Sequence, residues 1–171
     1  MKKSEIKAAN ATSRCNGAVS SDAIVPRLVV ERCSKEESIL DFGAGKSARH
    51  TMALKKQGFN ITAYEFGDNI VRDLHDPNAL ERQYDTVFAS NVLNVQMSLK
   101  MLGETLAQIK KALKPGGRLI ANYPDNPRKL NIIPQTVRHT LEKRFGEATL
   151  INGSESPSGS PVWEIINLKS I

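Results

Sequence analysis

Cysteine, histidine, aromatic residues and long apolar runs are all scarce in this chain. Its 171 residues include two cysteines and three histidines, and aromatic side chains make up 5%. Cys15 and Cys33 provide neither a disulfide framework nor metal-ligand spacing. No apolar run reaches the length of a transmembrane helix, and residues 1–5 do not lead into an apolar signal core. These absences favour a soluble cytoplasmic protein with no metal centre and no membrane partner.

The length suits one domain, and the charge is moderately positive. A chain of 171 residues is long enough to bury a stable hydrophobic core without the help of disulfide bonds or metal ions. Lysines on exposed helix faces account for most of the net charge of +6. Other basic residues fall in segments that we expect near the ligand face, which leaves a polyanionic acceptor open: Lys2, Lys3, Lys7, Arg14, Arg128 and Lys129. Few aromatic residues lie among them, so base stacking is not indicated.

The segment 38–47, SILDFGAGKS, is the most informative part of the chain. A short apolar stretch ends there and is followed by Gly43 and Gly45. Glycines let the backbone turn sharply out of a strand and approach a ligand where a Cβ would clash. This pattern is typical of a loop that binds a nucleotide cofactor.

The residues after this loop complete one βαβ unit. Residues 48–56 are good helix formers, and an alternating apolar segment, 60–65, follows them. Glu65 ends the second strand about 20 residues after the loop. An acidic residue at this spacing contacts ribose hydroxyls in dinucleotide-type folds.

Three cofactors compete for the loop. A Walker phosphate loop needs a glycine at position 40, where this chain has Leu40, so ATP is disfavoured. Gly43, Gly45 and Ala48 match the NAD fingerprint, which keeps a dehydrogenase as the third alternative. Asp41, however, would repel a pyrophosphate on this loop, whereas it would not repel a cationic ligand.

These residues resemble the first motif of the class I S-adenosylmethionine-dependent methyltransferase family. That motif is an acidic residue, any residue, Gly, any residue, Gly, and Asp41, Gly43 and Gly45 match it. The resemblance extends to Glu65 and to two further segments, 84–93 (YDTVFASNVL) and 113–120 (LKPGGRLI). In the family a helix ends in L-K-P-G-G and turns into the fifth strand, a feature that nicotinamide dehydrogenases do not share.

The resemblance covers the chain from about Ser38 to its end and implies an α/β fold. The family fold is Rossmann-like and doubly wound, with a mostly parallel seven-stranded sheet and an antiparallel C-terminal strand. Independently of the family, Lys114 favours a helix C-terminus, Pro115 stops the helix, and Gly116 and Gly117 allow the reversal.

The expected elements follow the family order, with one reduced region. Only about 20 residues separate Glu65 from Asp85, where the family fits a helix, a third strand and a helical turn. A short third strand at 70–74 and a helical turn at 76–82 are therefore expected. The other predicted helices are 21–32, 47–57, 100–113 and 134–145, and the other predicted strands are 38–42, 60–66, 86–90, 118–123, 149–152 and 162–168. The last two strands are joined by a short linker and are expected to be antiparallel.

Ligands bind outside the carboxyl ends of parallel strands, so the cofactor residues are expected there. The resemblance implies that Asp41 and Gly43 face the methionine part of S-adenosylmethionine, Glu65 the ribose, and His75 or Asp76 the adenine. The predicted cofactor-binding set is Asp41, Gly43, Ala44, Gly45, Glu65, Phe66, His75, Asp76, Ser90 and Asn91, with no metal ligand.

Asn91 and Tyr123 are the predicted catalytic residues. Asn91 occupies the family position between cofactor and acceptor, where it could accept or donate a hydrogen bond or simply cap the strand. Tyr123 ends the next strand, where it could contact an acceptor or pack, and the polar segment 122–129 is the expected acceptor loop. Family members that methylate nucleobase amino groups carry Asp or Asn, Pro, Pro and an aromatic residue after this strand. Residues 90–94 lack that tetrapeptide and a Pro-Cys nucleophile, which disfavours DNA base methylation.

The resemblance implies methyl transfer to an unidentified acceptor by in-line displacement. Such a protein holds donor and nucleophile in line and excludes water. The alternative is a catalytically silent module that binds the cofactor or its product as a regulator or partner subunit. The acceptor is expected to be a small molecule or an exposed nucleic-acid group, and a partner protein could complete the site. Residues 1–37 are expected to be a polar arm and a helix that could act as a lid on the cofactor domain, 38–171.

Overall fold

The computed structural model describes residues 1–12 and 23–168. Within them, six strands form one sheet in the order β2-β1-β3-β4-β6-β5. The strands are β1 (Ile39–Phe42), β2 (Ile61–Tyr64), β3 (Tyr84–Ala89), β4 (Leu113–Asn122), β5 (Ala148–Asn152) and β6 (Val162–Ile166). The first four are parallel to one another, while β6 runs antiparallel to both β4 and β5. The predicted Rossmann-like fold with an antiparallel C-terminal strand is confirmed, but the sheet of the described residues has six strands rather than the predicted seven.

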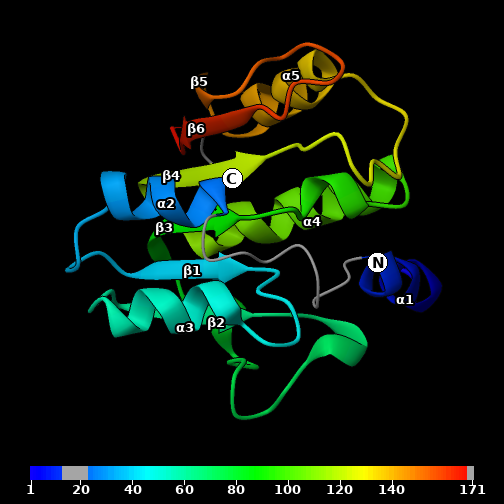
Figure 1. The fold of residues 1–171 in the computed structure, drawn as a ribbon. Helices are drawn as coiled ribbons and strands as arrows, with labels where there is room; N and C mark the ends of the chain where they lie inside the picture. The colour runs from blue at the N-terminus through cyan, green and yellow to red at the C-terminus, as the bar shows by residue number, and fades with distance from the viewer. Residues whose placement is uncertain (13–22, 169–171) are drawn as a thin grey trace.

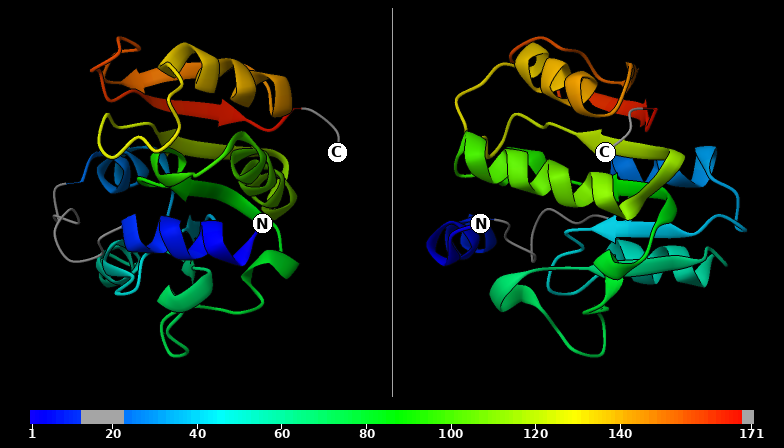
Figure 2. Two further views of the ribbon diagram at one scale, coloured as in Figure 1. Left: turned by 90° about the vertical axis from the view of Figure 1, so that its right-hand side faces the viewer. Right: turned by 180° about the vertical axis from the view of Figure 1, so that it is seen from behind.

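Helices cover both faces of the sheet, as the two side views show (Figures 1 and 2). On one face lie α2 (Ile24–Arg32) and α3 (Arg49–Lys56), and on the other lie α4 (Leu99–Ala112) and α5 (Pro134–Arg144). Each layer buries its own apolar cluster. Val25 and Val29 of α2 pack with Ile39 and Phe88 on the first face, and Leu106 of α4 belongs to the cluster on the second face. These two apolar clusters hold the helices against the two faces of the sheet, and the carboxyl ends of its parallel strands are left for ligands.

The third strand predicted at 70–74 is wrong. The backbone N–H groups of Leu74 and His75 both donate to the Val71 carbonyl, which makes this segment a turn. Asp76 alone reaches the outer edge of β2, where its N–H donates to the Ala63 carbonyl at 3.0 Å. Two short 3₁₀ helices, η1 (Gly67–Asn69) and η2 (Ala79–Glu81), occupy the rest of the shortened segment. The hydrogen bonds at 71–75 close a turn within the segment and do not pair it with a neighbouring strand.

The segment after α4 enters the sheet earlier than predicted. The helix ends at Ala112, and β4 starts at Leu113 rather than at 118, with a register shift where it leaves its first pairing with β3. Gly116 has a φ of +75°, as the expected reversal requires. Gly117 is needed for a different reason, since a Cβ there would lie 2.9 Å from the Lys114 carbonyl oxygen.

The first residues of the expected polar arm form a helix. Helix α1 (Lys3–Thr12) lies at the carboxyl end of the parallel strands (Figures 1 and 2). Residues 13–22 lie outside the described residues, and so does the predicted helix start at Ser21. Across the two described ranges, no helix is long and apolar enough to cross a membrane.

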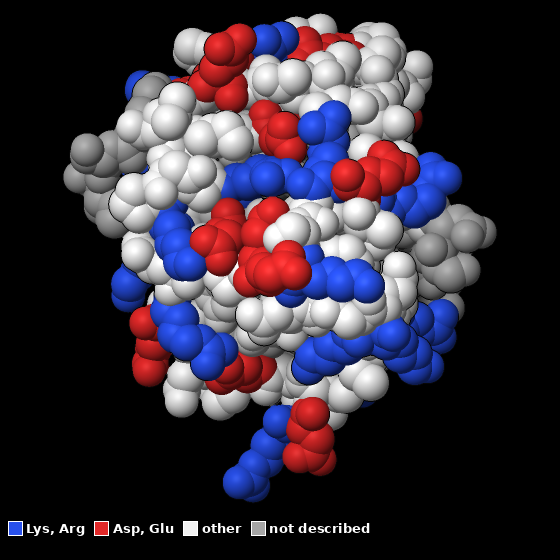
Figure 3. Space-filling model, turned by 90° about the vertical axis from the view of Figure 1, so that its left-hand side faces the viewer, with Lys and Arg blue, Asp and Glu red and all other residues white. Residues whose placement is uncertain are grey.

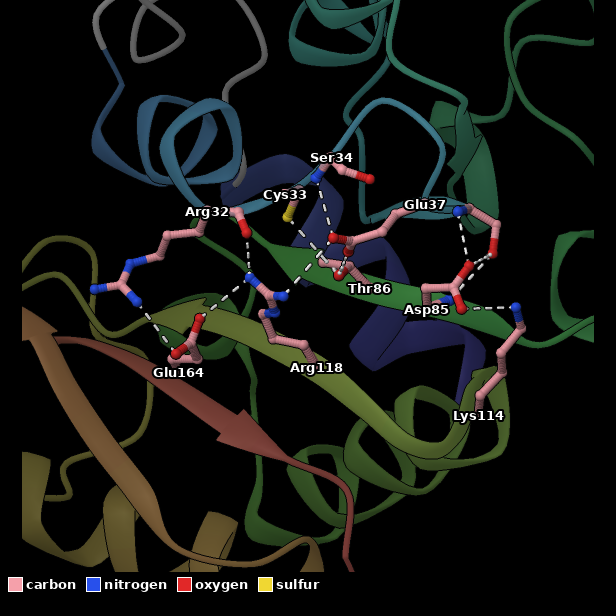
Figure 4. A network of polar contacts seen from close by, with 10 residues as sticks. Arg32, Cys33, Ser34, Glu37, Asp85, Thr86, Lys114, Arg118 and Glu164 are labelled. Carbon is pink, nitrogen blue, oxygen red and sulfur yellow. Dashed lines mark hydrogen bonds and ion pairs between the residues drawn. The ribbon is translucent and has the colours of Figure 1, made fainter.

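A polar network ties α2 to the sheet near the amino ends of the strands (Figure 4). Arg118 of β4 pairs with Glu37 and Glu164, and Glu37 also accepts from Thr86 at 2.7 Å. Beside it, the ammonium of Lys114 lies 2.7 Å from Asp85 and, with hydrogen bonds from Ser38, lowers the pKa of Asp85 to about 2. On this face acidic and basic side chains alternate, with no single-sign field (Figure 3).

The close backbone approach at Gly117 gives a test of the α4–β4 junction. We expect Gly117→Ala to destabilise the fold by about 1–3 kcal/mol, because its Cβ meets backbone carbonyls that cannot move independently. The matched control is Gly103→Ala in α4, where a Cβ meets nothing within 4 Å, and a gain of roughly 0.5–1 kcal/mol is expected. Urea unfolding measures both. Equal effects of the two substitutions would contradict this account of Gly117.

Candidate functional site

The order of the strands places a ligand crevice between β1 and β3. The chain passes from β1 to β2 on one side and later to β3 on the other, so the loops after β1 and β3 diverge from a switch point. The loops nevertheless touch at their bases. A Cβ added to Gly43, after β1, would lie 2.7 Å from Cγ2 of Val92, after β3. The predicted cofactor loop therefore meets the segment after β3 that carries Asn91.

The loop after β1 has the backbone that its glycines predict. Gly43 and Gly45 have φ values of +76° and +74°, and Ala48 just before α3 is also left-handed. The N–H groups of Gly43 and Ala44 both donate to the Tyr64 carbonyl at the end of β2, at 2.9 Å. The loop is thereby folded back over the ends of β1 and β2.

Glu65 and His75 hold Gly45 from two sides. The Gly45 N–H donates to Oε2 of Glu65 at 2.7 Å. The Val71 N–H donates to Nδ1 of His75, so the ring proton lies on Nε2, which donates to the Gly45 carbonyl at 2.9 Å. The structure thus brings together the ends of β1 and β2 and the shortened segment after β2.

Glu65 is buried but keeps hydrogen-bonding capacity. Its Oε1 accepts from the Phe66 N–H at 2.9 Å, so each carboxylate oxygen has one protein donor. An ionised carboxylate offers about four acceptor sites, which leaves room for hydroxyl donors from a ligand. Burial raises the pKa of Glu65, and the two backbone N–H groups oppose that rise.

Asp41 lies beneath the loop rather than at its surface. It is 1% exposed, and its Oδ2 accepts from the Thr51 hydroxyl in α3 at 2.8 Å. Burial is the main reason that the pKa of Asp41 rises to about 7, and the neighbouring charge of Glu65 adds to the rise, while Thr51 opposes it. Asp41 therefore joins β1 to α3 and places a titrating carboxyl behind the glycines.

The other predicted cofactor residues surround this loop in different ways. His75 is buried and hydrogen-bonded to Gly45. Asp76 instead forms an ion pair with Arg82 and accepts a hydrogen bond from the Asn78 N–H at 2.8 Å. Phe66 follows Glu65 and packs at the boundary between the main apolar cluster and the cluster under α1. Ser90 is half-buried directly after β3.

Asn91 and Asn122 form a reciprocal pair across the ends of β3 and β4. The Asn91 N–H donates to Oδ1 of Asn122 at 2.7 Å, and Nδ2 of Asn122 donates to Oδ1 of Asn91 at 2.8 Å. Asn91 has a φ of +59°, the left-handed region that asparagine tolerates better than most residues. Sequence reasoning singled out Asn91 and placed Asn122 in the expected acceptor loop 122–129 without giving it a role of its own, although its place at a parallel strand end was a usable signal.

Tyr123 is buried within the acceptor loop. It is 1% exposed, and its hydroxyl lies 3.2 Å from the Leu130 carbonyl and 3.3 Å from the Ile132 carbonyl. The Arg128 guanidinium lies over its ring at 4.5 Å from the centroid and donates to the Tyr123 carbonyl. These contacts favour a role in shaping the loop over direct contact with an acceptor.

The loops after β3 and β4 are also joined at Asn94. Its Nδ2 donates to the Asn126 carbonyl, and its own carbonyl accepts from the Lys129 N–H at 3.0 Å. Its Oδ1 is buried and has no hydrogen-bond partner among the described residues, and the same holds for Nδ2 of Asn69 after β2. Both orphaned atoms lie on segments at the carboxyl end of the sheet, where a ligand could satisfy them.

Helix α1 covers this end of the sheet, as the left view of Figure 2 shows. Nδ2 of Asn10 donates to the Phe66 carbonyl at 3.0 Å, and Glu5 accepts from the Ser98 hydroxyl at 2.6 Å. A Cβ at Gly67 would lie 2.6 Å from Cγ2 of Ile6, so the loop after β2 packs tightly against the helix. Sequence reasoning missed α1 as an ordered wall of the site.

Solved structures share this fold. A TehB-like SAM-dependent methyltransferase from Corynebacterium glutamicum superposes with a TM-score of 0.62 at 19% identity, covering 83% of this chain and 86% of the other. Magnesium protoporphyrin IX methyltransferase from Synechocystis has a TM-score of 0.64 at 14% identity, with 98% of both chains covered. At these identities the likeness concerns the fold.

Sequence comparison finds a much longer relative. The hybrid PKS-NRPS synthetase LUC5 of a Fusarium species is 29% identical over an alignment of 107 residues, and the match covers 48% of this chain and 3% of the synthetase. This chain thus spans a small fraction of that relative.

A family model described as a methyltransferase domain matches residues 19–152. The matched range contains the loop after β1, Glu65, Asn91 and the β4 segment, which are the residues that carried the resemblance in the sequence. The chain therefore belongs to the methyltransferase domain family, with the fold of the class I S-adenosylmethionine-dependent enzymes.

Proposed function

We propose that this chain binds S-adenosylmethionine at the carboxyl ends of β1 and β2 and transfers its methyl group to an acceptor held between the loops after β3 and β4. The observation that carries the proposal is the fixed Gly43–Gly45 loop at the switch point. Its backbone is left-handed at both glycines and is held by the side chains of Glu65 and His75. A ligand can approach this loop more closely than it could approach residues with a Cβ.

The residues present fit the cofactor. Glu65 has acceptor sites left for ribose hydroxyls, and Asn69 after β2 has a buried Nδ2 that lacks a partner among the residues described. Asp41 and Glu65 are two buried acids beside one loop, which favours a ligand that carries positive charge. When bound, the sulfonium supplies an activated methyl group, and the chain's own task is to orient the acceptor and exclude water.

The acceptor side is built from short segments. The loop after β4 is braced by Tyr123, Arg128 and Asn94, and it faces the segment that begins at Asn91. The magnesium protoporphyrin IX methyltransferase acts on a small molecule by its name, and we propose an acceptor of that class. An exposed nucleic-acid group, a partner protein and a cytoplasmic location stay predictions.

We further propose that α1, within the arm 1–37, is a lid over the cofactor domain. Its helix bridges the loop after β2, through Asn10, and the start of α4, through Glu5. Ile6 and Ala9 add apolar contacts with Phe66 and Met101. A cover on the carboxyl end would exclude water from bound cofactor.

Titration with S-adenosylhomocysteine tests the cofactor assignment. We expect calorimetric binding to the wild type and about 10- to 100-fold weaker binding to Glu65→Gln, because a hydrogen bond to a charged group contributes roughly 1.5–3 kcal/mol. Glu81→Gln, at an exposed position of η2, is the matched control and should bind as the wild type does. Binding of NADH in place of S-adenosylhomocysteine would refute the proposal and move the site to hydride transfer.

The pKa of Asp41 predicts how stability changes with pH. In the folded protein its pKa is about 7, above the unfolded value of about 3.9. Between these values the folded state holds the extra proton, so the stability that Asp41 contributes is complete at low pH and is lost as pH rises to about 7. We expect the free energy of unfolding to fall by up to about 1.4 kcal/mol per pH unit in this window.

Asp41→Asn should make that slope shallower, since its amide carries no proton that titrates. The substitution keeps the size of the side chain and an oxygen for the Thr51 hydroxyl. Urea unfolding at intervals from pH 5 to 8 gives both slopes. Parallel curves for the two proteins would show that Asp41 does not titrate in this range.

Hydrogen exchange tests the lid. We expect S-adenosylhomocysteine to slow amide exchange in α1 by tenfold or more, because the helix packs on the loop that follows Glu65. Amides of α5, which lies near the far edge of the sheet, serve as the control and should change little. Asn10→Ala should reduce the protection of α1. Unchanged exchange in α1 on a demonstrably liganded protein would rule out the lid.

A further inference from the structure

Asn91 lies where the two halves of the proposed site meet. It is the second residue after β3, and its neighbour Val92 is the residue that a Cβ at Gly43 would strike. Its left-handed backbone, at a φ of +59°, sets the direction in which its side chain leaves the chain. The conformation of Asn91 is therefore part of the site's geometry and needs a stabilising contact.

Asn122 supplies that contact from inside the fold. It is 4% exposed at the end of β4, and its side chain makes two hydrogen bonds to Asn91, at 2.7 and 2.8 Å. One bond holds the backbone and the other holds the carboxamide. Asn122 thus fixes both the φ of Asn91 and the rotation of its side chain.

The backbone bond determines how both carboxamides are oriented. A main-chain N–H can only donate, so the atom of Asn122 that faces it must be Oδ1. The other branch of Asn122 is then Nδ2, which can only donate, so the atom of Asn91 that faces it must be Oδ1. Nδ2 of Asn91 is left as the opposite branch, and no residue of the described chain accepts from it. Asn91 is half-buried, so this branch is not sealed in the core.

We propose that Asn122 is a positioning residue that presents Asn91 to the acceptor as a hydrogen-bond donor. The acceptor then carries an oxygen or nitrogen lone pair, such as a carbonyl oxygen, beside the nucleophile that receives the methyl group. Asn91 binds and orients this group and takes no proton. The inference rests on the proposed function and specifies the chemistry of its acceptor.

Three matched probes separate donor from acceptor chemistry: aniline, 2-aminoacetophenone and benzene-1,2-diamine. All carry an aromatic amine, and beside it they have respectively no group, a carbonyl acceptor and a second N–H donor. Their affinities are measured by NMR titration of the protein saturated with S-adenosylhomocysteine. For the wild type we expect 2-aminoacetophenone to bind at least tenfold more tightly than the other two.

Two substitutions at the pair make the test specific. Asn91→Gly keeps the left-handed backbone without a side chain, and it should abolish the preference for the carbonyl probe. Asn122→Asp keeps an acceptor for the Asn91 N–H but replaces the donor with a second acceptor. The carboxamide of Asn91 should then rotate to donate to the carboxylate, so its Oδ1 faces the probe and benzene-1,2-diamine becomes the preferred ligand. A residue with a merely structural role would weaken all three probes together.

The controls distinguish this inference from the function on which it rests. Asn60→Asp makes the same chemical change at an exposed position before β2 and should leave the probe order unchanged. If S-adenosylhomocysteine fails to bind the wild type, the proposed function fails. If it binds but the wild type shows no preference among the probes, or Asn122→Asp leaves the preference unreversed, the positioning role of Asn122 is refuted.

Discussion

The hydrogen bond from the Gly45 N–H to Glu65 is the interaction on which the site depends. It joins the loop after β1 to the end of β2, between two residues that are 20 positions apart in the sequence. On the other side of Gly45, Nε2 of His75 donates to the Gly45 carbonyl. A left-handed glycine alone leaves a loop free to adopt several paths, whereas these two side chains select one. The same contacts explain how the shortened segment stays ordered without a third strand. That segment is anchored to the cofactor loop through His75 and to the edge of β2 through Asp76.

The fold could be predicted from the sequence because its signals are local. Glycines after an apolar run, an acid at the end of the next strand and the Lys114–Gly117 junction each report the backbone at their own position, and together they set the order of elements. The third strand at 70–74 was predicted wrongly because it was expected from the family order, whereas local hydrogen bonds between Val71 and His75 hold the segment as a turn. The bond from His75 to Gly45, 30 residues away, then anchors that turn to the cofactor loop. Helix α1 was missed because its apolar face is short and gains its contacts only from segments such as Phe66 and Met101.

Within the site, the types of residue could be predicted from the sequence, but the directions in which their side chains point could not. The sequence indicates that Asn91 follows a strand, yet whether its side chain donates or accepts depends on Asn122, which lies 31 residues later. Asp41 was expected to face the ligand, whereas the structure places its carboxyl beneath the loop against Thr51. Such orientations depend on which strands become neighbours, and periodicity in one segment carries no information on that.

Electrostatics connects ligand binding to the stability of this domain. Asp41 and Glu65 are both buried, both have raised pKa values, and the charge of Glu65 contributes to the shift of Asp41. Burying two acids side by side costs free energy whenever both are ionised, because neither is fully paired with a cation. A positively charged group at the adjacent loop lowers that cost and shifts both acids towards their ionised forms. The arrangement that we propose to favour a cation over a pyrophosphate at this loop therefore also makes the folded state more stable when a cation is bound.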